Sequence, residues 1–174
     1  MSKRSNIFLV GPMGAGKTTI GRRLADNRGM QFLDSDQEVE SRCGVEIAFI
    51  FEKEGEAGFR RREVQAIAEL SALSGIVLAT GGGAVMDAES RRLLSQRGIV
   101  IYLHASIEQQ FARTARSDHR PLLQNGNRRE TLECLFSIRD PLYREIADLV
   151  VETDGRNARA LAREIEDFLD GDSG

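Results

Sequence analysis

The sequence is poor in cysteine and contains no long hydrophobic run. Its two cysteines, Cys43 and Cys134, form no Cys-x-x-Cys pair, so we expect neither a disulfide framework nor a zinc site. Both should instead be half-buried small side chains. No apolar stretch approaches the roughly 20 residues of a membrane span, and the N-terminus has no signal-type apolar region. We therefore expect a cytoplasmic protein without a membrane partner.

The chain also has no excess of positive charge. Its net charge is −3, whereas a protein that binds nucleic acid through bulk charge would be basic, so we expect no nucleic-acid partner. Lysine supplies only three of the 24 basic residues, which leaves 21 arginines. Because the guanidinium group suits carboxylates and phosphates, arginines that stand outside ordinary solvated helix faces are candidate anion-binding residues.

Short apolar segments alternate with segments of helical spacing. The 174 residues, 41% of them hydrophobic, suffice for one sizeable core, and we expect a single domain over residues 1–174. This alternation predicts an α/β fold with a parallel sheet, helices on both faces, and ligands at the carboxyl ends of the strands. The strand candidates are residues 7–10, 31–33, 75–79, 99–103 and 149–152.

Two further features belong to the C-terminal half. Residues 114–129 are rich in arginine, asparagine and glycine and predict a long loop. In a phosphoryl-transfer enzyme such a loop can act as a lid that excludes water and carries an arginine to the transferred group. Arg120, next to Pro121, is the best candidate for this role, and Arg113 is a weaker one. Pro141 predicts a break or a new start in the helical segment around it.

Residues 11–18 read Gly-Pro-Met-Gly-Ala-Gly-Lys-Thr, directly after the first strand candidate and directly before a helical segment. Such a loop directs backbone N–H groups at a polyphosphate, and the following helix N-terminus adds its partial positive charge. Lys17 can contact the β and γ phosphates, and the Thr18 hydroxyl can ligate Mg²⁺. The sequence therefore predicts nucleotide binding.

Polar or glycine residues follow the next two strands. Asp34-Ser35-Asp36 can cap a helix; equally, one carboxylate can order the hydration of Mg²⁺ while the other accepts a hydrogen bond from a substrate hydroxyl. Both functions can coexist. Gly81-Gly82-Gly83 exceeds what a plain turn needs, so we favour close approach of the backbone to a ligand.

Arg60 and Arg139 stand beside apolar residues in helical segments. Each alone is more typical of a surface residue than of a ligand-binding one. Together with the Asp36 carboxylate, they would suit an acceptor that carries both a carboxylate and hydroxyls.

Several motifs in order along nearly the whole chain resemble the bacterial shikimate kinases. They are the phosphate loop, Leu33-Asp34-Ser35-Asp36, Gly58-Phe59-Arg60, the three glycines, Arg120-Pro121-Leu122-Leu123 and Arg139-Asp140-Pro141-Leu142-Tyr143. The resemblance implies a three-layer P-loop kinase fold with a five-stranded parallel sheet and a lid. It further implies Mg²⁺-dependent transfer of the ATP γ-phosphate to the 3-hydroxyl of shikimate, on the route to chorismate and the aromatic amino acids.

The resemblance also implies roles for individual residues. Lys17, Asp36 and Arg120 would be catalytic, with Asp36 able to act as the base, and Thr18 and Asp34 would hold the metal. Shikimate would be bound by Asp36, Arg60, Gly82 and Arg139. ATP would be bound by Gly14, Ala15, Gly16, Lys17, Thr18, Thr19, Arg113, Arg120 and Arg156, the last near the adenine. We expect a monomer.

Two other functions remain open at this point. A related small kinase for gluconate or a nucleoside monophosphate would share the phosphate loop and the lid. A nucleotide-binding module without catalysis is the second alternative. The Asn-Lys-x-Asp stretch of GTP switches does not occur in the sequence, which argues against that form of the second alternative.

Overall fold

Five parallel strands form the centre of the protein. The computed structural model describes residues 6–115 and 127–172. The strands are β1 (Ile7–Val10), β2 (Gln31–Asp34), β3 (Ile76–Ala79), β4 (Ile99–His104) and β5 (Leu149–Glu152). They lie in the order β2-β3-β1-β4-β5, and all neighbours are parallel. The predicted parallel sheet and the positions of its five strands are confirmed, with ends that differ by no more than one residue.

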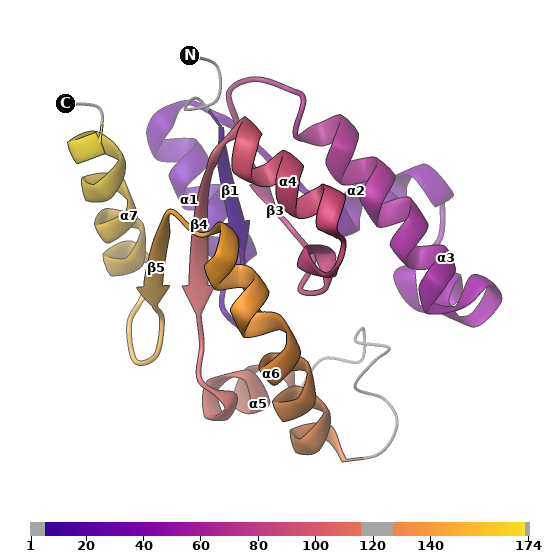
Figure 1. Cartoon of the computed structure of the whole chain (residues 1–174). Helices are drawn as coiled ribbons and strands as arrows, with labels where there is room; N and C mark the ends of the chain where they lie inside the picture. The colour runs from indigo at the N-terminus through magenta and orange to yellow at the C-terminus, as the bar shows by residue number, and fades with distance from the viewer. Residues whose placement is uncertain (1–5, 116–126, 173–174) are drawn as a thin grey trace.

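Helices cover both faces of this sheet. The apolar core on one face includes residues of α1 and α7, and the core on the other includes residues of α3, α4 and α6 (Figure 1). The helices are α1 (Lys17–Arg28), α2 (Ser35–Cys43), α3 (Ile47–Leu70), α4 (Ala88–Arg97), α5 (Ile107–Thr114), α6 (Arg128–Ile146) and α7 (Ala158–Asp172), with a 3-10 turn, η2 (Ala84–Met86).

The strand sequences explain this layered arrangement. In β1, Ile7 and Leu9 belong to the core beneath α1 and α7, whereas Phe8 and Val10 belong to the core on the opposite face. Successive side chains of a strand point to opposite faces, so an apolar run is stable only where both faces are covered. All four residues are buried. The continuous apolar runs therefore require helices on both sides.

Helix α3 is interrupted at Gly55. This residue has φ 73° and ψ 179°, which places it in a region of positive φ that favours glycine. Both parts of α3 pack with α2 in a small separate cluster, which contains Val39 of α2, Ile50 before the interruption, and Phe59 and Ala66 after it. The part after it contains Arg60, and its residues Ile67 and Leu70 pack in the core on one face of the sheet.

Three sequence expectations need correction. The expected loop over residues 114–129 is shorter at both ends, because Thr114 belongs to α5 and α6 begins at Arg128; its centre, including Arg120, lies outside the described residues. Pro141 lies inside α6 and does not end it, since the burial of Tyr143 and Ile146 after it outweighs one lost helical hydrogen bond. Cys134 is exposed, while Cys43 is half-buried as expected.

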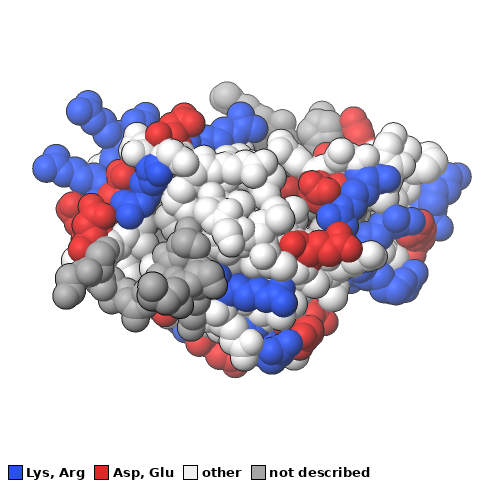
Figure 2. All heavy atoms as spheres, turned by 90° about the horizontal axis from the view of Figure 1, so that it is seen from above, with Lys and Arg blue, Asp and Glu red and all other residues white. Residues whose placement is uncertain are grey.

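The surface agrees with the composition. Within residues 6–115 and 127–172, no helix is long and apolar enough to span a membrane. Figure 2 shows the face on which the strands begin, where basic and acidic side chains are interspersed rather than gathered by sign. Many arginines are paired with neighbouring carboxylates, for example Arg62 with Glu54 and Arg28 with Asp170.

Candidate active site

The phosphate loop joins β1 to α1 at the end of the sheet toward which β4 and β5 point in Figure 1. Gly14 has φ 83° and Gly16 has φ 90°, backbone angles that residues with a Cβ rarely adopt. Gly16 is the N-cap of α1 and provides no side-chain cap. The first amides of α1 are therefore available for an anion, as helix N-termini generally are.

Two cations lie against this loop. Lys17 Nζ donates to the carbonyl oxygens of Gly11 and Pro12 at 2.6 and 2.9 Å. Arg113 Nη1, from α5, donates to the carbonyl oxygen of Gly14 at 3.0 Å. Both groups thus stand where they would meet a bound polyphosphate.

The carboxylate of Asp34 both caps α2 and faces the phosphate loop. Its Oδ1 accepts from the amides of Asp36 and Gln37 at 2.9 and 3.1 Å. Its Oδ2 lies 3.4 Å from Thr18 Oγ1, which donates to it. The expected cap is confirmed. Carboxylate and hydroxyl oxygens are ligands that suit Mg²⁺ beside nucleotide phosphates, so this pair fits the predicted metal site.

Charged side chains pack directly on the glycine triplet, residues 81–83. A Cβ added to Gly81 would lie 2.6 Å from Asp36 Oδ1 and 2.8 Å from Glu63 Oε2, and one added to Gly82 would lie 3.2 Å from Arg139 Nη1. One added to Gly83 would collide with the guanidinium of Arg60. None of the three glycines has positive φ. They are therefore needed for space and not for an unusual backbone conformation.

Glu63 is a site residue that the sequence analysis missed. It is only 2% exposed, and its Oε1 accepts from Arg60 Nη1 at 2.8 Å. Burial raises the pKa of the Glu63 carboxyl despite the nearby Arg60. Burial alone would lower the pKa of Arg60, but Glu63 and Glu56 raise it. The only signal in the sequence was an i,i+3 pair of opposite charges, which is more typical of a solvated helix face.

Arg139 is also buried, with 5% of the residue exposed. Burial lowers the pKa of its guanidinium, and the charge of Arg60 acts in the same direction. Two guanidinium groups near one another and largely withdrawn from water favour an anionic ligand, since such a ligand would relieve their repulsion. Arg60 and Arg139, which the sequence suggested as a pair, therefore lie together at the glycine triplet.

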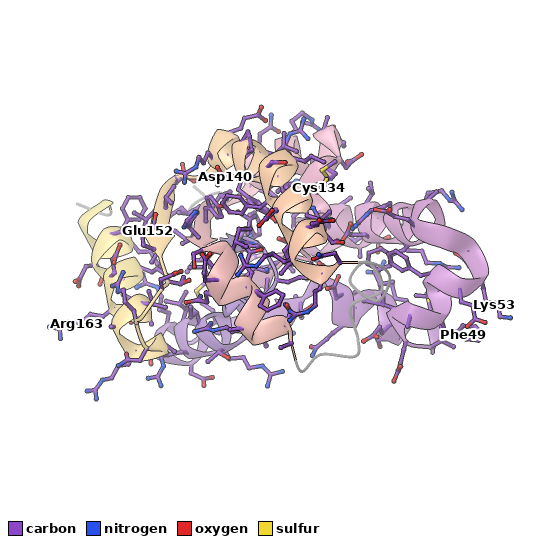
Figure 3. The ribbon with its side chains drawn as sticks, turned by 90° about the horizontal axis from the view of Figure 1, so that it is seen from below. Phe49, Lys53, Cys134, Asp140, Glu152 and Arg163 are labelled. Carbon is purple, nitrogen blue, oxygen red and sulfur yellow. The ribbon has the colours of Figure 1, made fainter. Side chains whose placement is uncertain are left out.

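Most of the predicted site residues share one cavity of about 380 Å³. Figure 3 looks onto this end of the molecule, with Phe49 and Lys53 of α3 on one side and Glu152 and Arg163 on the other. A second hollow, of about 590 Å³, begins at Gly83 and Arg60. The predicted residues that line the first cavity are Gly14, Gly16, Lys17, Thr18, Thr19, Asp34, Asp36, Gly82 and Arg113.

The other predicted residues differ in position. Ala15, within the loop, is fully buried. The guanidinium groups of Arg60 and Arg139 lie next to the glycine triplet, which in turn borders the cavity. Arg156 lies apart from this cavity and pairs with Glu164 at 2.7 Å, while its Nη1 also donates to the carbonyl oxygen of Glu152. Arg120 lies outside the described residues.

Comparison with known proteins identifies the family. The family model described as shikimate kinase matches residues 13–170. The shikimate kinase of Shewanella oneidensis is 58% identical over 169 residues, which cover 97% of this chain and 99% of that protein. A structure of shikimate kinase from Acinetobacter baumannii in complex with shikimate has a TM-score of 0.95 and 51% identity, and covers 98% of this chain and 96% of that chain.

A gluconokinase from Sinorhizobium meliloti 1021 is a more distant structural neighbour. Its TM-score is 0.63 at 17% identity, with 97% of this chain and 93% of that chain covered. This similarity shows a shared fold and nothing narrower. The family model and the high identity over almost the whole length carry the closer assignment. The chain belongs to the shikimate kinase family.

Proposed function

We propose that this chain transfers the γ-phosphate of ATP to the 3-hydroxyl of shikimate, the activity expected of its family. One observation carries the proposal: a phosphate loop and a set of groups suited to a hydroxy acid meet at one end of the sheet. The loop suits the polyphosphate, the carboxylate of Asp36 suits a hydroxyl, and Arg60 with Arg139 suits a carboxylate.

At the donor end, residues 14–19 would surround the phosphates of ATP. Lys17 would leave the loop carbonyls and bind the transferring group, and Arg113 would approach the phosphates from α5. Thr18 and Asp34 would hold Mg²⁺, which when bound neutralises part of the phosphate charge. Arg156 near the adenine and Arg120 on a lid complete the proposed nucleotide site.

At the acceptor end, Asp36 would accept a hydrogen bond from the reacting hydroxyl and can take up its proton. Its Oδ1 lies beside Gly81, at the boundary between the loop cavity and the arginines. Arg60 and Arg139 would hold the carboxylate of shikimate, and the backbone of Gly82 would lie against the ring. Catalysis then depends on alignment of the hydroxyl with the γ-phosphate and on stabilisation of spread negative charge.

We propose further that the protein works as a single-domain monomer in the cytoplasm. Support comes from the donor and acceptor residues in the described part of the chain, which converge within one protomer. Gel filtration with in-line light scattering tests the monomer directly, because a dimer would have twice the mass of 19.3 kDa.

The activity is tested by release of ADP in the presence and absence of shikimate. We expect ADP release that depends on shikimate and on Mg²⁺, and ³¹P NMR should detect one new phosphate monoester. Gluconate and nucleoside monophosphates serve as comparison acceptors. Turnover with one of these and none with shikimate would overturn the proposal, and so would nucleotide binding without any acceptor-dependent turnover.

A further inference from the structure

Two buried hydroxyl groups hold the glycine triplet from opposite sides. Ser35 Oγ, at the start of α2, accepts from the amide of Gly81 at 3.0 Å. The Tyr143 hydroxyl, on α6, donates to the carbonyl oxygen of Gly82 at 2.6 Å. Ser35 is fully buried and Tyr143 is 1% exposed, so neither bond competes with water.

These bonds restrict a segment that would otherwise be flexible. Glycine has more backbone freedom than any other residue, and the triplet has no side chains with which to pack. In a trans peptide the C=O and N–H groups point in opposite directions. The bond to Tyr143 therefore turns the amide of Gly83 away from α6. Within the described residues, no hydrogen bond is donated by the amides of Gly82 and Gly83, and Gly82, which is half-buried, lines the loop cavity.

Tyr143 also connects the triplet to the arginine pair. Tyr143 follows Arg139 by four residues on α6, so the two side chains share one face of the helix, and the Arg139 guanidinium lies next to Gly82. The Tyr143 ring packs against Tyr102 with 4.8 Å between centroids. Tyr102 in turn donates to Asp140, which Figure 3 labels on α6, at 2.6 Å. Tyr143 and Arg139 thus approach Gly82 from the same face of α6.

We propose that Ser35 and Tyr143 are positioning residues for the acceptor. Neither lines the cavity that contains the phosphate loop, and both act through groups that do contact the acceptor. The inference rests on the proposed function, since it concerns the binding of shikimate. It predicts a selective loss of acceptor affinity when either hydroxyl is removed while the side chain is otherwise retained.

The test uses Tyr143→Phe with Tyr102→Phe as its matched control. Each variant removes one buried phenolic hydroxyl from a pair of packed rings, but only Tyr143 contacts the triplet. For Tyr143→Phe we expect the KM for shikimate to rise about 5- to 30-fold, since a buried carbonyl loses its donor. The KM for ATP should change less than about twofold, and Tyr102→Phe should leave both values within that limit.

Ser35→Ala provides a second test in case Tyr143→Phe is unfolded at the assay temperature. It removes the acceptor of the Gly81 amide and should raise the shikimate KM by about 3- to 10-fold, again without an equal change for ATP. Wild-type turnover of shikimate reports the proposed function separately. An unchanged shikimate KM in a folded Tyr143→Phe or Ser35→Ala variant overturns the inference. Equal changes for both substrates, or an equal effect of Tyr102→Phe, also overturn it.

Discussion

Replacement of Glu63 by glutamine should change how the stability of the protein depends on pH and make it a poorer enzyme. Glu63 is almost fully buried, and its Oε2 has no hydrogen-bond partner among the described residues. Burial raises the pKa of its carboxyl even though Arg60 lies 2.8 Å from Oε1. The folded protein therefore holds this negative charge at a cost. Glutamine has the same shape and no charge.

The sign of the stability effect follows from proton binding. The pKa of Glu63 is higher in the folded protein than its ordinary value of 4.5, so above that pH the folded state binds more protons than the unfolded state. Stability thus falls as the pH rises from 4.5 toward the folded pKa, by up to about 1.4 kcal/mol for each pH unit. Glu63→Gln abolishes this dependence. The stability of the variant relative to wild type should therefore be higher at about pH 8 than at about pH 5.

The effect on activity should be a loss. A hydrogen bond between a guanidinium and a carboxylate contributes about 1.5–3 kcal/mol, and a neutral amide contributes about 1 kcal/mol. Because the bond from residue 63 to Arg60 is weaker in the variant, its affinity for shikimate should fall about tenfold, with little change in its affinity for ATP.

Urea unfolding across this pH range and steady-state kinetics with both substrates measure the two effects. Glu63→Asp is a useful control, because it keeps the charge but shortens the reach to Arg60. If the stabilities of wild type and Glu63→Gln change in parallel between about pH 5 and 8, the assigned cost of burial is wrong. An unchanged shikimate KM would refute the role of Glu63 in holding Arg60.

Three further predictions concern the loop, the arginine pair and the core. Lys17→Ala should lower kcat about a hundredfold or more with little change in melting temperature, since it removes the cation for the transferring phosphate; near-normal turnover would contradict this. Arg139→Ala should raise the shikimate KM about 30-fold or more and the ATP KM far less, and equal changes would reject its role. Gly21→Ala places a Cβ 2.5 Å from the Phe32 ring, so calorimetry should show a melting temperature lower by about 2–8 °C, with both KM values retained.

Much of the site could be predicted because its residues stand at places with a local physical signature. The glycines of the phosphate loop and the glycine triplet follow strands, Asp34 ends one, and apolar strands are easy to recognise. Arg60 and Arg139 are recognisable in the sequence because they stand next to apolar residues. The roles proposed for them follow from the family resemblance rather than from the spacing.

Other features depend on tertiary contacts that leave no local trace. Glu63 follows Arg60 by three residues, and this spacing is the same for a buried pair as for a solvated one. Pro141 normally disfavours a helix interior, but the burial of Tyr143 and Ile146 after it keeps α6 continuous. Ser35 and Tyr143 hold the glycine triplet across 46 and 61 residues of sequence. No short sequence window could reveal those two bonds.

The glycine triplet also ties acceptor recognition to completion of the fold. Its neighbours come from the start of α2, the middle of α3 and the last half of α6, so a chain that lacks α6 would retain the phosphate loop but not the full acceptor pocket. A molecule that binds only the native state stabilises it by about 2.7 kcal/mol at a concentration of one hundred times its Kd. Shikimate would therefore act as a pharmacological chaperone for the whole chain, and its thermal protection would report whether the C-terminal third has docked.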